Sequence, residues 1–288
     1  MADESNEPKL SEMQYRVVKQ LGAGAGSTIF LIADKTRGGQ RYALKVVNRQ
    51  DAEDDIYIDQ AKTEFEVSQK LKHPAIVRIY DCRIKKKLFR VVGIDLLMEY
   101  LDGKTLDELL PSPDLGQLVL IFNEIASGLV MMHRRGVFHG DMKPSNIMLT
   151  KAGEVKLIDL GTAWIKGREK NRIQGTPQYI APETINEKIV DERSDIYNFG
   201  ATMYRMFTGR YANMGPPKPG DSPKNKPATP MQINPKIPGT LNETIMACLE
   251  QNRDKRPSMF EIKNQLKAVL RYLGLKETDL KGVPEEEE

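Results

Sequence analysis

The chain has few of the residues that build disulfide frameworks or metal clusters: its 288 residues include two cysteines, Cys82 and Cys248, and three histidines. Two cysteines exclude a disulfide-stapled scaffold, and such scarcity is typical of a reducing compartment. Long apolar runs are missing too, because the longest, 118–122, is far shorter than the ~18 residues of a membrane span. The N-terminal residues are polar and acidic, unlike a secretory signal. We therefore expect a cytoplasmic protein without a membrane span.

An excess of charge of one sign is missing as well. Lysine and arginine total 43, against 40 aspartates and glutamates, so the net charge at pH 7 is only +3. This balance argues against nucleic acid as the main partner. Hydrophobic residues make up 40% and charged residues 29%, as in a folded globular protein. The length is enough for two ordinary domains or for one large domain with two lobes.

The first third of the chain reads as strands. Short runs rich in β-branched and aromatic residues, separated by glycine-rich or polar turns, occur at 15–20, 28–33, 41–47, 76–82 and 87–100. We expect the last of these to be two strands that share a turn. A helical pattern covers 61–71 and ends at His73-Pro74. The run Lys85-Lys86-Lys87 is expected to be a solvated hairpin tip.

After Asp102-Gly103 the periodicity becomes helical. Helices are predicted at 117–133, 194–208, 241–250 and 258–273. Eight of the 17 prolines fall within 209–238, which predicts a surface loop. We therefore expect an α+β protein with a small sheet-rich lobe (14–101) and a large helical lobe (102–275). A flexible tail (1–13) and an acidic tail (276–288), loose at least in its closing residues 282–288, would flank them.

Two features of the first lobe point to bound anions. A glycine-rich turn, Leu21-Gly-Ala-Gly-Ala-Gly-Ser27, lies between two predicted strands, where glycines let backbone N–H groups approach phosphate oxygens. Such a turn can equally be a plain hairpin. Lys45 lies in an apolar strand, so either its ammonium reaches the surface or an anionic partner lies inside. Its apolar neighbours favour the internal partner.

The strongest chemical signal is a pair of polar segments that border hydrophobic runs. The first is His139-Gly-Asp-Met-Lys-Pro-Ser-Asn146, and the second is Asp159-Leu-Gly161. Their carboxylates and amide offer oxygen ligands for Mg²⁺ and leave one carboxylate that can accept a proton. The alternative is a pair of polar turns around a buried hairpin, which would require these residue types to share these spacings by chance.

These segments, in this order, resemble the eukaryotic-type (Hanks-type) protein kinases of the serine/threonine branch, over about 15–273. The motifs of that family are a glycine-rich loop, a strand lysine, a catalytic loop, D-F-G and A-P-E. Here they correspond to Gly22 and Gly24, Lys45, 139–146, 159–161 and 181–183. The resemblance implies a bilobal protein kinase fold, ATP with Mg²⁺ or Mn²⁺, and protein substrates with Ser or Thr acceptors.

The resemblance also implies a role for each matching residue. Asp141 would position the substrate hydroxyl and accept its proton, and Lys143 would stabilise charge on the transferred phosphoryl group. Lys45 would hold the ATP phosphates and pair with Glu64, which the spacing to His-Pro favours over Glu66. Asn146 and Asp159 would bind the metal. The nucleotide site would comprise Leu21, Gly22, Ala23, Gly24, Ser27, Ile29, Ala43, Lys45, Met98, Glu99, Leu101 and Met148. Glu183 would pair with Arg256, and Asp195 would anchor the catalytic loop.

Three departures from the family pattern concern packing or the nucleotide loop. Ser27 replaces the third loop glycine, Leu160 replaces the usual phenylalanine, and Ser68 falls where an apolar contact of the helix is usual. None of these changes removes a catalytic group. Leu160 is still apolar, so it can pack against the helix that carries Glu64.

A fourth departure predicts how the protein is regulated. Gly140 stands where many kinases have an arginine that meets a phosphate on the activation loop. Between Asp159 and Glu183 the only hydroxyl side chains are Thr162, Thr176 and Tyr179. The phosphate receptor and the middle-loop phosphosite are therefore missing together. This predicts activity without activation-loop phosphorylation.

Two other functions remain open on the sequence. Some small-molecule phosphotransferases also use a His-Gly-Asp loop, but Lys143, 175–179, 181–183 and Arg256 resemble a peptide-binding platform. Pro144 after Lys143, and Thr176 placed to contact Asp141, indicate Ser or Thr acceptors. A non-catalytic scaffold would usually lack Lys45, Asp141 or Asp159, and all three are present. Turnover of labelled ATP with protein, with small alcohols or with neither separates the three interpretations.

Overall fold

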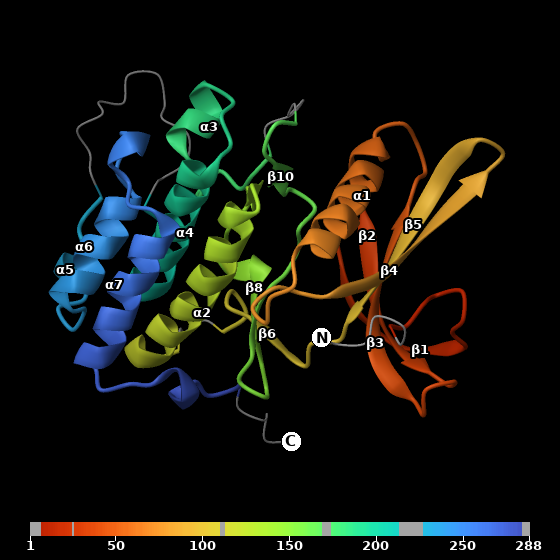
Figure 1. Ribbon diagram of the computed structural model, residues 1–288, viewed down its shortest axis with the longest axis horizontal. Coiled ribbons are helices and arrows are strands. Elements are labelled where there is room, and N and C mark those ends of the chain that lie inside the picture. The colour runs from red at the N-terminus through yellow and green to blue at the C-terminus, as the bar shows by residue number, and fades with distance from the viewer. Residues whose placement is uncertain (1–6, 25, 110–112, 169–173, 213–226, 284–288) are drawn as a thin grey trace. The chain divides into compact units, whose positions relative to one another are not determined.

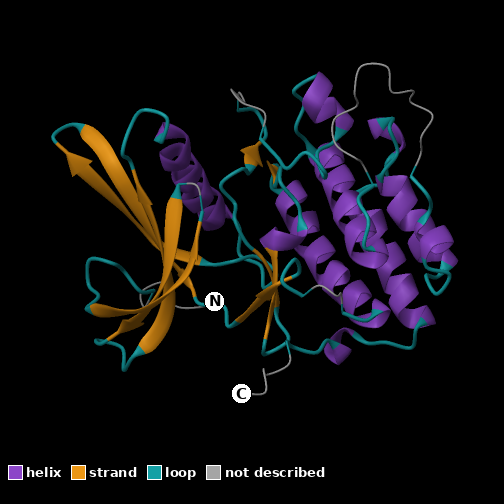
Figure 2. Cartoon of the chain, turned by 180° about the vertical axis from the view of Figure 1, so that it is seen from behind, coloured by secondary structure: helices purple, strands orange, loops and turns teal. Residues whose placement is uncertain are grey.

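The computed structural model describes residues 7–24, 26–109, 113–168, 174–212 and 227–283 (Figure 1). The chain divides into two compact units. Unit 1 comprises Met1–Lys72, Ile76–Leu101 and Asp159–Gly161, and unit 2 comprises His73–Ala75, Asp102–Ile158 and Thr162–Glu288. Strands dominate unit 1 and helices dominate unit 2 (Figure 2). The expected α+β class with a sheet-rich and a helical lobe is confirmed.

Unit 1 is built on an antiparallel five-stranded sheet in the order β1-β2-β3-β5-β4. Its strands are β1 (Tyr15–Ala23), β2 (Ser27–Asp34), β3 (Gln40–Asn48), β4 (Ile79–Lys87) and β5 (Arg90–Glu99). The expectation of two strands within 87–100 is wrong, because β5 is continuous. Gly93 lies inside it, where a Cβ would come within 2.8 Å of the Val47 carbonyl oxygen, so this glycine allows close strand approach.

One helix, α1 (Asp55–Lys70), packs on this sheet. It begins earlier than predicted, since Ile56, Tyr57 and Ile58 follow one another directly and show no helical spacing. Ala61 and Glu64 share its buried face. Ser68 is buried as well, and its hydroxyl donates to the Phe65 carbonyl at 2.7 Å. Ser68 stands where the family usually has an apolar contact, and its hydroxyl finds its hydrogen-bond acceptor within the helix itself.

The segment before β1 packs against unit 1, so the expectation of a loose tail is wrong for this part. Leu10 is 3% exposed, and its N–H donates to the Asp81 carboxylate at 2.7 Å. Glu7 forms an ion pair with Arg78. Leu10 belongs to a core cluster with Ile32, Tyr42, Leu44 and Leu97. A single leucine in a polar stretch shows no periodicity, so the sequence pattern did not predict its burial.

Unit 2 is mainly helical. Its helices are α2 (Leu115–Arg134), α3 (Pro182–Asn186), α4 (Glu192–Thr208), α5 (Pro230–Ile233), α6 (Gly239–Cys248) and α7 (Met259–Tyr272), with 3₁₀ turns η2 (Pro144–Asn146), η3 (Arg253–Lys255) and η4 (Glu277–Asp279). The four predicted long helices are all present. The prolines of 209–238 did not exclude α5, because Pro230 takes the first helical position behind a Thr229 cap. Residues 213–226 of that predicted loop lie outside the described residues.

Short strands complete unit 2 and carry the polar segments. One small sheet has the order β6-β8-β9, formed by β6 (Gly103–Thr105), β8 (Ile147–Thr150) and β9 (Val155–Leu157). A second pairs β7 (Val137–Phe138) with β10 (Trp164–Ile165). The segment that contains Asp141 therefore begins at β7 and ends through η2 at β8.

Helix α2 is long and apolar enough, by length and composition alone, to cross a membrane. In this structure 61% of its apolar window is buried, with Phe122 packed edge-to-face on Phe199 of α4. Asp114 caps the helix by accepting from the Gln117 N–H. These features are those of a core helix. Polar residues such as Asn123 and Glu124 interrupt its sequence, so no long apolar run was evident.

The C-terminal segment also packs on unit 2, up to the last described residue. Gln117 donates to the Asp279 carbonyl and accepts from the Lys281 N–H. Val283 is 7% exposed, and its N–H donates to the Thr150 carbonyl. The expectation that the closing residues 282–288 are loose is therefore wrong for 282–283, and 284–288 lie outside the described residues.

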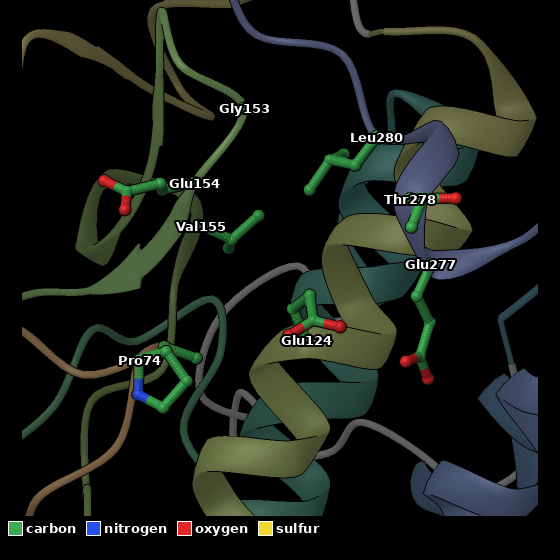
Figure 3. Close-up of a pocket in the computed structure, with 9 residues that line it drawn as sticks. Pro74, Glu124, Gly153, Glu154, Val155, Glu277, Thr278 and Leu280 are labelled. Atoms are coloured by element: carbon green, nitrogen blue, oxygen red, sulfur yellow. The ribbon is translucent and has the colours of Figure 1, made fainter.

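A hollow of about 380 Å³ lies beside this segment in unit 2 (Figure 3). Its lining is partly acidic, with Glu124, Glu154 and Glu277, and partly apolar, with Pro74, Ala75, Val155 and Leu280. Burial and the charge of Glu277 raise the pKa of Glu124. None of the residues expected to bind nucleotide or metal lines this hollow.

The packing of Leu10 predicts a measurable loss of stability. Leu10→Ala should lower the free energy of unfolding by about 2–5 kcal/mol, the usual range for truncating a buried leucine. Lys9→Ala is the matched control, because the Lys9 side chain is 61% exposed. Urea unfolding of both variants tests this, and equal stability of the two would contradict the packing of Leu10.

Candidate active site

Three charged side chains meet within unit 1. The Lys45 Nζ on β3 lies 2.6 Å from the Glu64 Oε2 on α1 and 3.7 Å from the Asp159 Oδ1. The Glu64 side chain is 1% exposed and that of Lys45 is 15% exposed. Glu66 instead pairs with Lys70 on the outer side of the helix, at 3.1 Å. The lysine in the apolar strand thus has the internal anionic partner that its surroundings suggested.

Opposing effects set the charge state of this pair. Burial works against a charged Lys45, but the carboxylates of Glu64 and Asp159 outweigh it and raise the pKa of Lys45. Complete burial raises the pKa of Glu64, while the Lys45 ammonium opposes that rise. The Coulomb attraction between the two side chains is strong because little water screens it.

The glycine-rich hairpin stands beside Lys45 in the same sheet. Gly22 on β1 is paired with Ile29 on β2, and Ile29 is paired with Lys45 on β3. The Gly24 N–H donates to the Ser27 carbonyl at 2.8 Å and closes the hairpin. Ala23 ends β1 between these glycines. Sheet register thus places the loop backbone next to the lysine.

Two of the expected adenine-binding residues of unit 1 are paired across neighbouring strands of this sheet. Ala43 on β3 faces Met98 on β5, and both are nearly buried at 8% and 7% exposure. Leu21 is 40% exposed, Glu99 ends β5 and Leu101 ends this part of unit 1. The Glu99 side chain accepts from the Arg78 N–H at 2.7 Å. Met148 belongs to unit 2, on β8.

Tyr57 is a neighbour of the glycine-rich loop that the sequence did not suggest. It lies in the first turns of α1, and its ring packs directly on Gly26. A Cβ at Gly26 would overlap the ring atoms, so a residue with a side chain would displace the tyrosine. The contact joins the loop to the helix that carries Glu64. No motif marks Tyr57, because its partner lies far away along the chain.

The segment 159–161 holds an unusual backbone conformation. Asp159 has φ +63°, in the left-handed region that non-glycine residues seldom adopt. The Gly161 N–H donates to the Asp159 Oδ1 at 3.3 Å. The Asp159 side chain is 46% exposed, whereas Leu160 is completely buried. Leu160 thus fills an apolar position, as expected for the residue that replaces phenylalanine.

In unit 2, Asp141 is held by two neighbours. Its Oδ1 accepts from both the N–H and the hydroxyl of Thr176 at 2.9 Å. Its Oδ2 lies 2.8 Å from the Lys143 Nζ, which also donates to the Thr176 hydroxyl at 3.0 Å. The expected contact between Thr176 and Asp141 is therefore present. The carboxylate is oriented by charge-assisted hydrogen bonds, which are stronger than neutral ones.

Asn146 is tied to the same loop. Its side-chain N–H donates to the Asp141 carbonyl at 2.8 Å, and its own carbonyl accepts from the Ile158 N–H at 2.9 Å. With the amide nitrogen used this way, the side-chain oxygen is the atom left for another ligand.

The loop that leads to Asp141 is fixed from beneath by Asp195 of α4, which is completely buried. Its carboxylate accepts from the backbone N–H groups of His139 (2.7 Å) and Gly140 (2.8 Å), and lies 3.0 Å from the His133 Nε2. Burial alone would raise the pKa of Asp195, but His133 and the Gly140 N–H outweigh it and lower that pKa. The expected anchoring role is matched by this geometry.

A second buried ion pair holds the segment 181–183. The Arg256 guanidinium binds the Glu183 carboxylate through two contacts, of 2.6 and 2.9 Å. The Arg256 side chain has no exposed surface, and its other donors meet the carbonyls of Glu250 and Arg193. Burial opposes the charge of Glu183, yet its bonds to Arg256 lower the pKa of Glu183. The expected Glu183–Arg256 pair is thus formed within unit 2.

The loop hydroxyls all have contacts inside unit 2. The Thr162 hydroxyl donates to the His139 carbonyl at 3.1 Å, Thr176 binds Asp141, and Tyr179 is 5% exposed with its ring against Tyr211. Burial and Tyr211 raise the pKa of Tyr179. Residues 169–173, which include Glu169, Lys170 and Arg172 of the loop, lie outside the described residues.

The two expected metal ligands carry donor atoms of the type that a hard divalent cation prefers. A carboxylate from Asp159 and an amide oxygen from Asn146 are the oxygen ligands that Mg²⁺ prefers, and Mg²⁺ commonly takes few protein ligands beside substrate phosphates. Asp159 belongs to unit 1 and Asn146 to unit 2. Within the described residues, no group of three or more His, Cys, Asp or Glu side chains could hold a metal by itself.

Comparison with known proteins agrees with these motifs. The family model described as the protein kinase domain matches residues 15–266. A probable serine/threonine-protein kinase of Streptomyces coelicolor is 32% identical over 270 residues, which cover 87% of this chain and 39% of that protein. The serine/threonine-protein kinase PknB of Mycolicibacterium smegmatis is 29% identical, over 84% of this chain and 40% of that protein. This chain thus spans about two fifths of the length of these relatives.

Proposed function

Because this chain belongs to the protein kinase domain family, which uses ATP and a divalent metal, we propose that it transfers the γ-phosphoryl group of ATP to Ser and Thr hydroxyls of proteins. The observation that carries this proposal is the Asp141 carboxylate, held by Thr176 on one oxygen and by Lys143 on the other. An oriented carboxylate beside a lysine is suited to bind a hydroxyl and to stabilise phosphoryl charge.

In the proposed reaction the substrate hydroxyl donates a hydrogen bond to Asp141. Its oxygen forms a bond to the γ-phosphorus, the bond from that phosphorus to the bridging oxygen of ADP breaks, and Asp141 accepts the proton. Lys143 stabilises the negative charge of the phosphoryl group during transfer. Phosphoryl transfer depends mostly on positioning and electrostatics, so the bonds that fix Asp141 matter as much as its proton affinity.

Unit 1 would hold the nucleotide. The backbone of Gly22, Ala23, Gly24 and Ser27 would cradle the phosphates, with Lys45 paired to Glu64 as the cation that binds them. The adenine ring would lie among apolar side chains, with the Glu99 carbonyl and the Leu101 N–H at its polar edge. The apolar set is Leu21, Ile29, Ala43, Met98 and Met148. The cross-strand pairing of Ala43 with Met98 supports this assignment.

Asn146 and Asp159 would hold Mg²⁺ or Mn²⁺, which when bound neutralises charge on the ATP phosphates. ATP as substrate and the free thiols of Cys82 and Cys248 fit a cytoplasmic location.

Protein substrates are favoured over small alcohols by the buried Glu183–Arg256 pair. This pair fixes the segment 181–183, which is separated from Gly175–Tyr179 by a single residue. A small-molecule acceptor would not require so firm a platform next to Thr176. Pro144 after Lys143, and the double contact of Thr176 with Asp141, support Ser or Thr as the acceptor.

We further propose that the enzyme is active without activation-loop phosphorylation. Gly140 offers no cation to a loop phosphate, and the three described loop hydroxyls are engaged in unit 2. An arginine at position 140 would leave unpaired positive charge near Asp141 until a phosphate neutralised it. With glycine there is no such charge to neutralise.

The assignment of the catalytic residues is tested by Asp141→Asn and Lys45→Met. Asp141→Asn should lower kcat by roughly 10²–10⁴-fold, the usual contribution of a general base. Lys45→Met should lower kcat/KM for ATP by on the order of 10²-fold, because the phosphates lose their positioning cation. Both variants should keep their circular dichroism spectrum. Near-full activity of either folded variant would refute the role of that residue.

The contact of Tyr57 with Gly26 predicts non-additive effects on nucleotide binding. Gly26→Ala should raise the KM for ATP severalfold with little change in kcat, because the new methyl group displaces the ring and shifts the loop. Tyr57→Ala in the same chain makes room for that methyl, so the double variant should be less impaired than the summed single effects predict. Tyr57→Phe keeps the ring and should behave as wild type.

Gly239→Ala is the matched control for this cycle, since a Cβ there meets nothing within 4 Å. Strictly additive effects of Gly26→Ala and Tyr57→Ala would show that the contact between these residues does not position the loop.

Independence from loop phosphorylation is tested with phosphatase-treated protein. Mass spectrometry should show unmodified Thr162, Thr176 and Tyr179, and this preparation should keep its activity. Gly140 has φ +79°, so Gly140→Ala should itself lower activity through backbone strain. The control for Gly140→Arg is therefore Gly140→Asn, because asparagine tolerates a left-handed backbone better than other residues with a side chain. The arginine variant should be the less active. Activity that returns only on phosphorylation within 159–183 would overturn the idea.

A further inference from the structure

The turn between β4 and β5 exposes two large apolar side chains side by side. Leu88 is 90% exposed and Phe89 is fully exposed, at 101%. Exposed apolar residues that occur singly need no explanation, but an adjacent pair at the tip of a hairpin is a different case. Lys86, Lys87 and Arg90 flank the pair and are exposed as well. The tip is thus apolar at its end and cationic around it.

Folding does not account for leucine at this position. Leu88 has φ +54°, in the left-handed region where asparagine or glycine fits a hairpin turn at lower cost. A leucine there gains no burial in return. The folded chain by itself therefore gives no reason for a leucine at this position.

The cations of the hairpin fall into two groups. Arg83 and Lys85, nearer its base, bind the buried carboxylate of Asp95, each at 2.6 Å. Lys86 and Lys87 form no ion pair within the described part of the chain. The charge at the tip is therefore available to an external anion. The whole chain has a net charge of only +3, so its overall charge gives little attraction to anionic surfaces and a local cluster such as this one would have to supply it.

We propose that the tip of the β4–β5 hairpin, residues 86–90, docks unit 1 on an anionic lipid surface. Leu88 and Phe89 would enter the boundary between headgroups and acyl chains, while Lys86, Lys87 and Arg90 would meet the lipid phosphates. This juxtaposition of an apolar end with a cationic collar is complementary to the layered chemistry of such a surface.

The shape of the tip favours lipid over a protein partner. A stable protein interface buries about 800 Å² on each partner, which a turn with two apolar side chains does not supply. A bilayer deforms around a protruding wedge and needs no matching pocket. The tip contains none of the residues proposed for ATP, metal or phosphoryl transfer, so docking is independent of the proposed function.

Vesicle sedimentation of the full chain tests the proposal. The chain should bind vesicles of phosphatidylcholine with phosphatidylserine and leave pure phosphatidylcholine vesicles unbound, with binding that weakens as salt increases. The variant with Lys86→Glu and Lys87→Glu should bind at least roughly tenfold more weakly, because each lysine near the surface contributes. Binding that is equal on both vesicle types, or independent of salt, would overturn the proposal.

Leu88→Asn separates docking from folding. It relieves the left-handed leucine, so the melting temperature should stay the same or rise, while vesicle binding falls severalfold. Phe260→Ser, at an aromatic residue that is 53% exposed on α7, is the matched control and should bind as wild type. Unchanged vesicle binding by Leu88→Asn would refute the role of the tip.

Insertion itself can be observed directly, because Trp164 is the single tryptophan of the chain. In a Trp164→Phe background, Phe89→Trp should shift its fluorescence to the blue with phosphatidylserine vesicles. A shift that appears instead on self-association without lipid would assign the tip to a second copy of the chain and overturn the proposal.

Discussion

The buried carboxylate of Asp195 is the interaction that holds the loop leading to Asp141. It has no exposed surface, and it meets the backbone of two consecutive loop residues and the ring of His133. Removing any of the three N–H donors would be costly, because the buried carboxylate would lose a hydrogen bond and no water could replace it. These bonds hold the backbone just before Asp141, and they thereby fix the position of Asp141 itself. The position of Asp141 thus depends on a buried residue of α4 that lies behind its loop.

Unit 1 uses a buried ion pair in a similar way. Lys45 and Glu64 join a strand to a helix, and Asp159 approaches the same ammonium. Buried ion pairs are weak evidence of stability, since desolvation offsets much of their attraction. Their value here is geometric, because only one position of α1 brings Glu64 to the lysine. The Tyr57 ring adds a second link from α1, to Gly26, so the helix and the glycine-rich loop constrain each other.

The ends of the described chain and the exposed hairpin show two opposite uses of apolar side chains. Leu10 and Val283 are single apolar residues that close gaps on unit 1 and unit 2, and both are buried. Leu88 and Phe89 are exposed although Leu88 adopts a backbone conformation that leucine disfavours. Burial explains the first pair through transfer of apolar surface from water. Burial does not explain the second pair, and this is the observation behind the proposed lipid contact.

Much of the fold and the candidate site was predictable from the sequence alone. The strands of unit 1 and the long helices of unit 2 follow from periodicity, because regular burial imposes a regular pattern. Lys45, Asp141, Asn146 and Asp159 were identified as candidates because the family motifs that they match place fixed residue types at fixed spacings within short segments. The sequence therefore determined the fold class and the family, and it named the candidate residues of the site.

Only the tertiary structure decided which distant residues meet. The family spacing favoured Glu64 over Glu66 as the partner of Lys45, and the structure supplies the physical reason, because Glu64 lies on the buried face of α1. Three other features depend on a single residue each: the ring of Tyr57 on Gly26, the burial of Leu10 and the left-handed backbone at Leu88. A single residue produces no periodic pattern, so the sequence did not predict them. Contacts between residues far apart in the chain arise from packing of whole elements, and no local pattern records them.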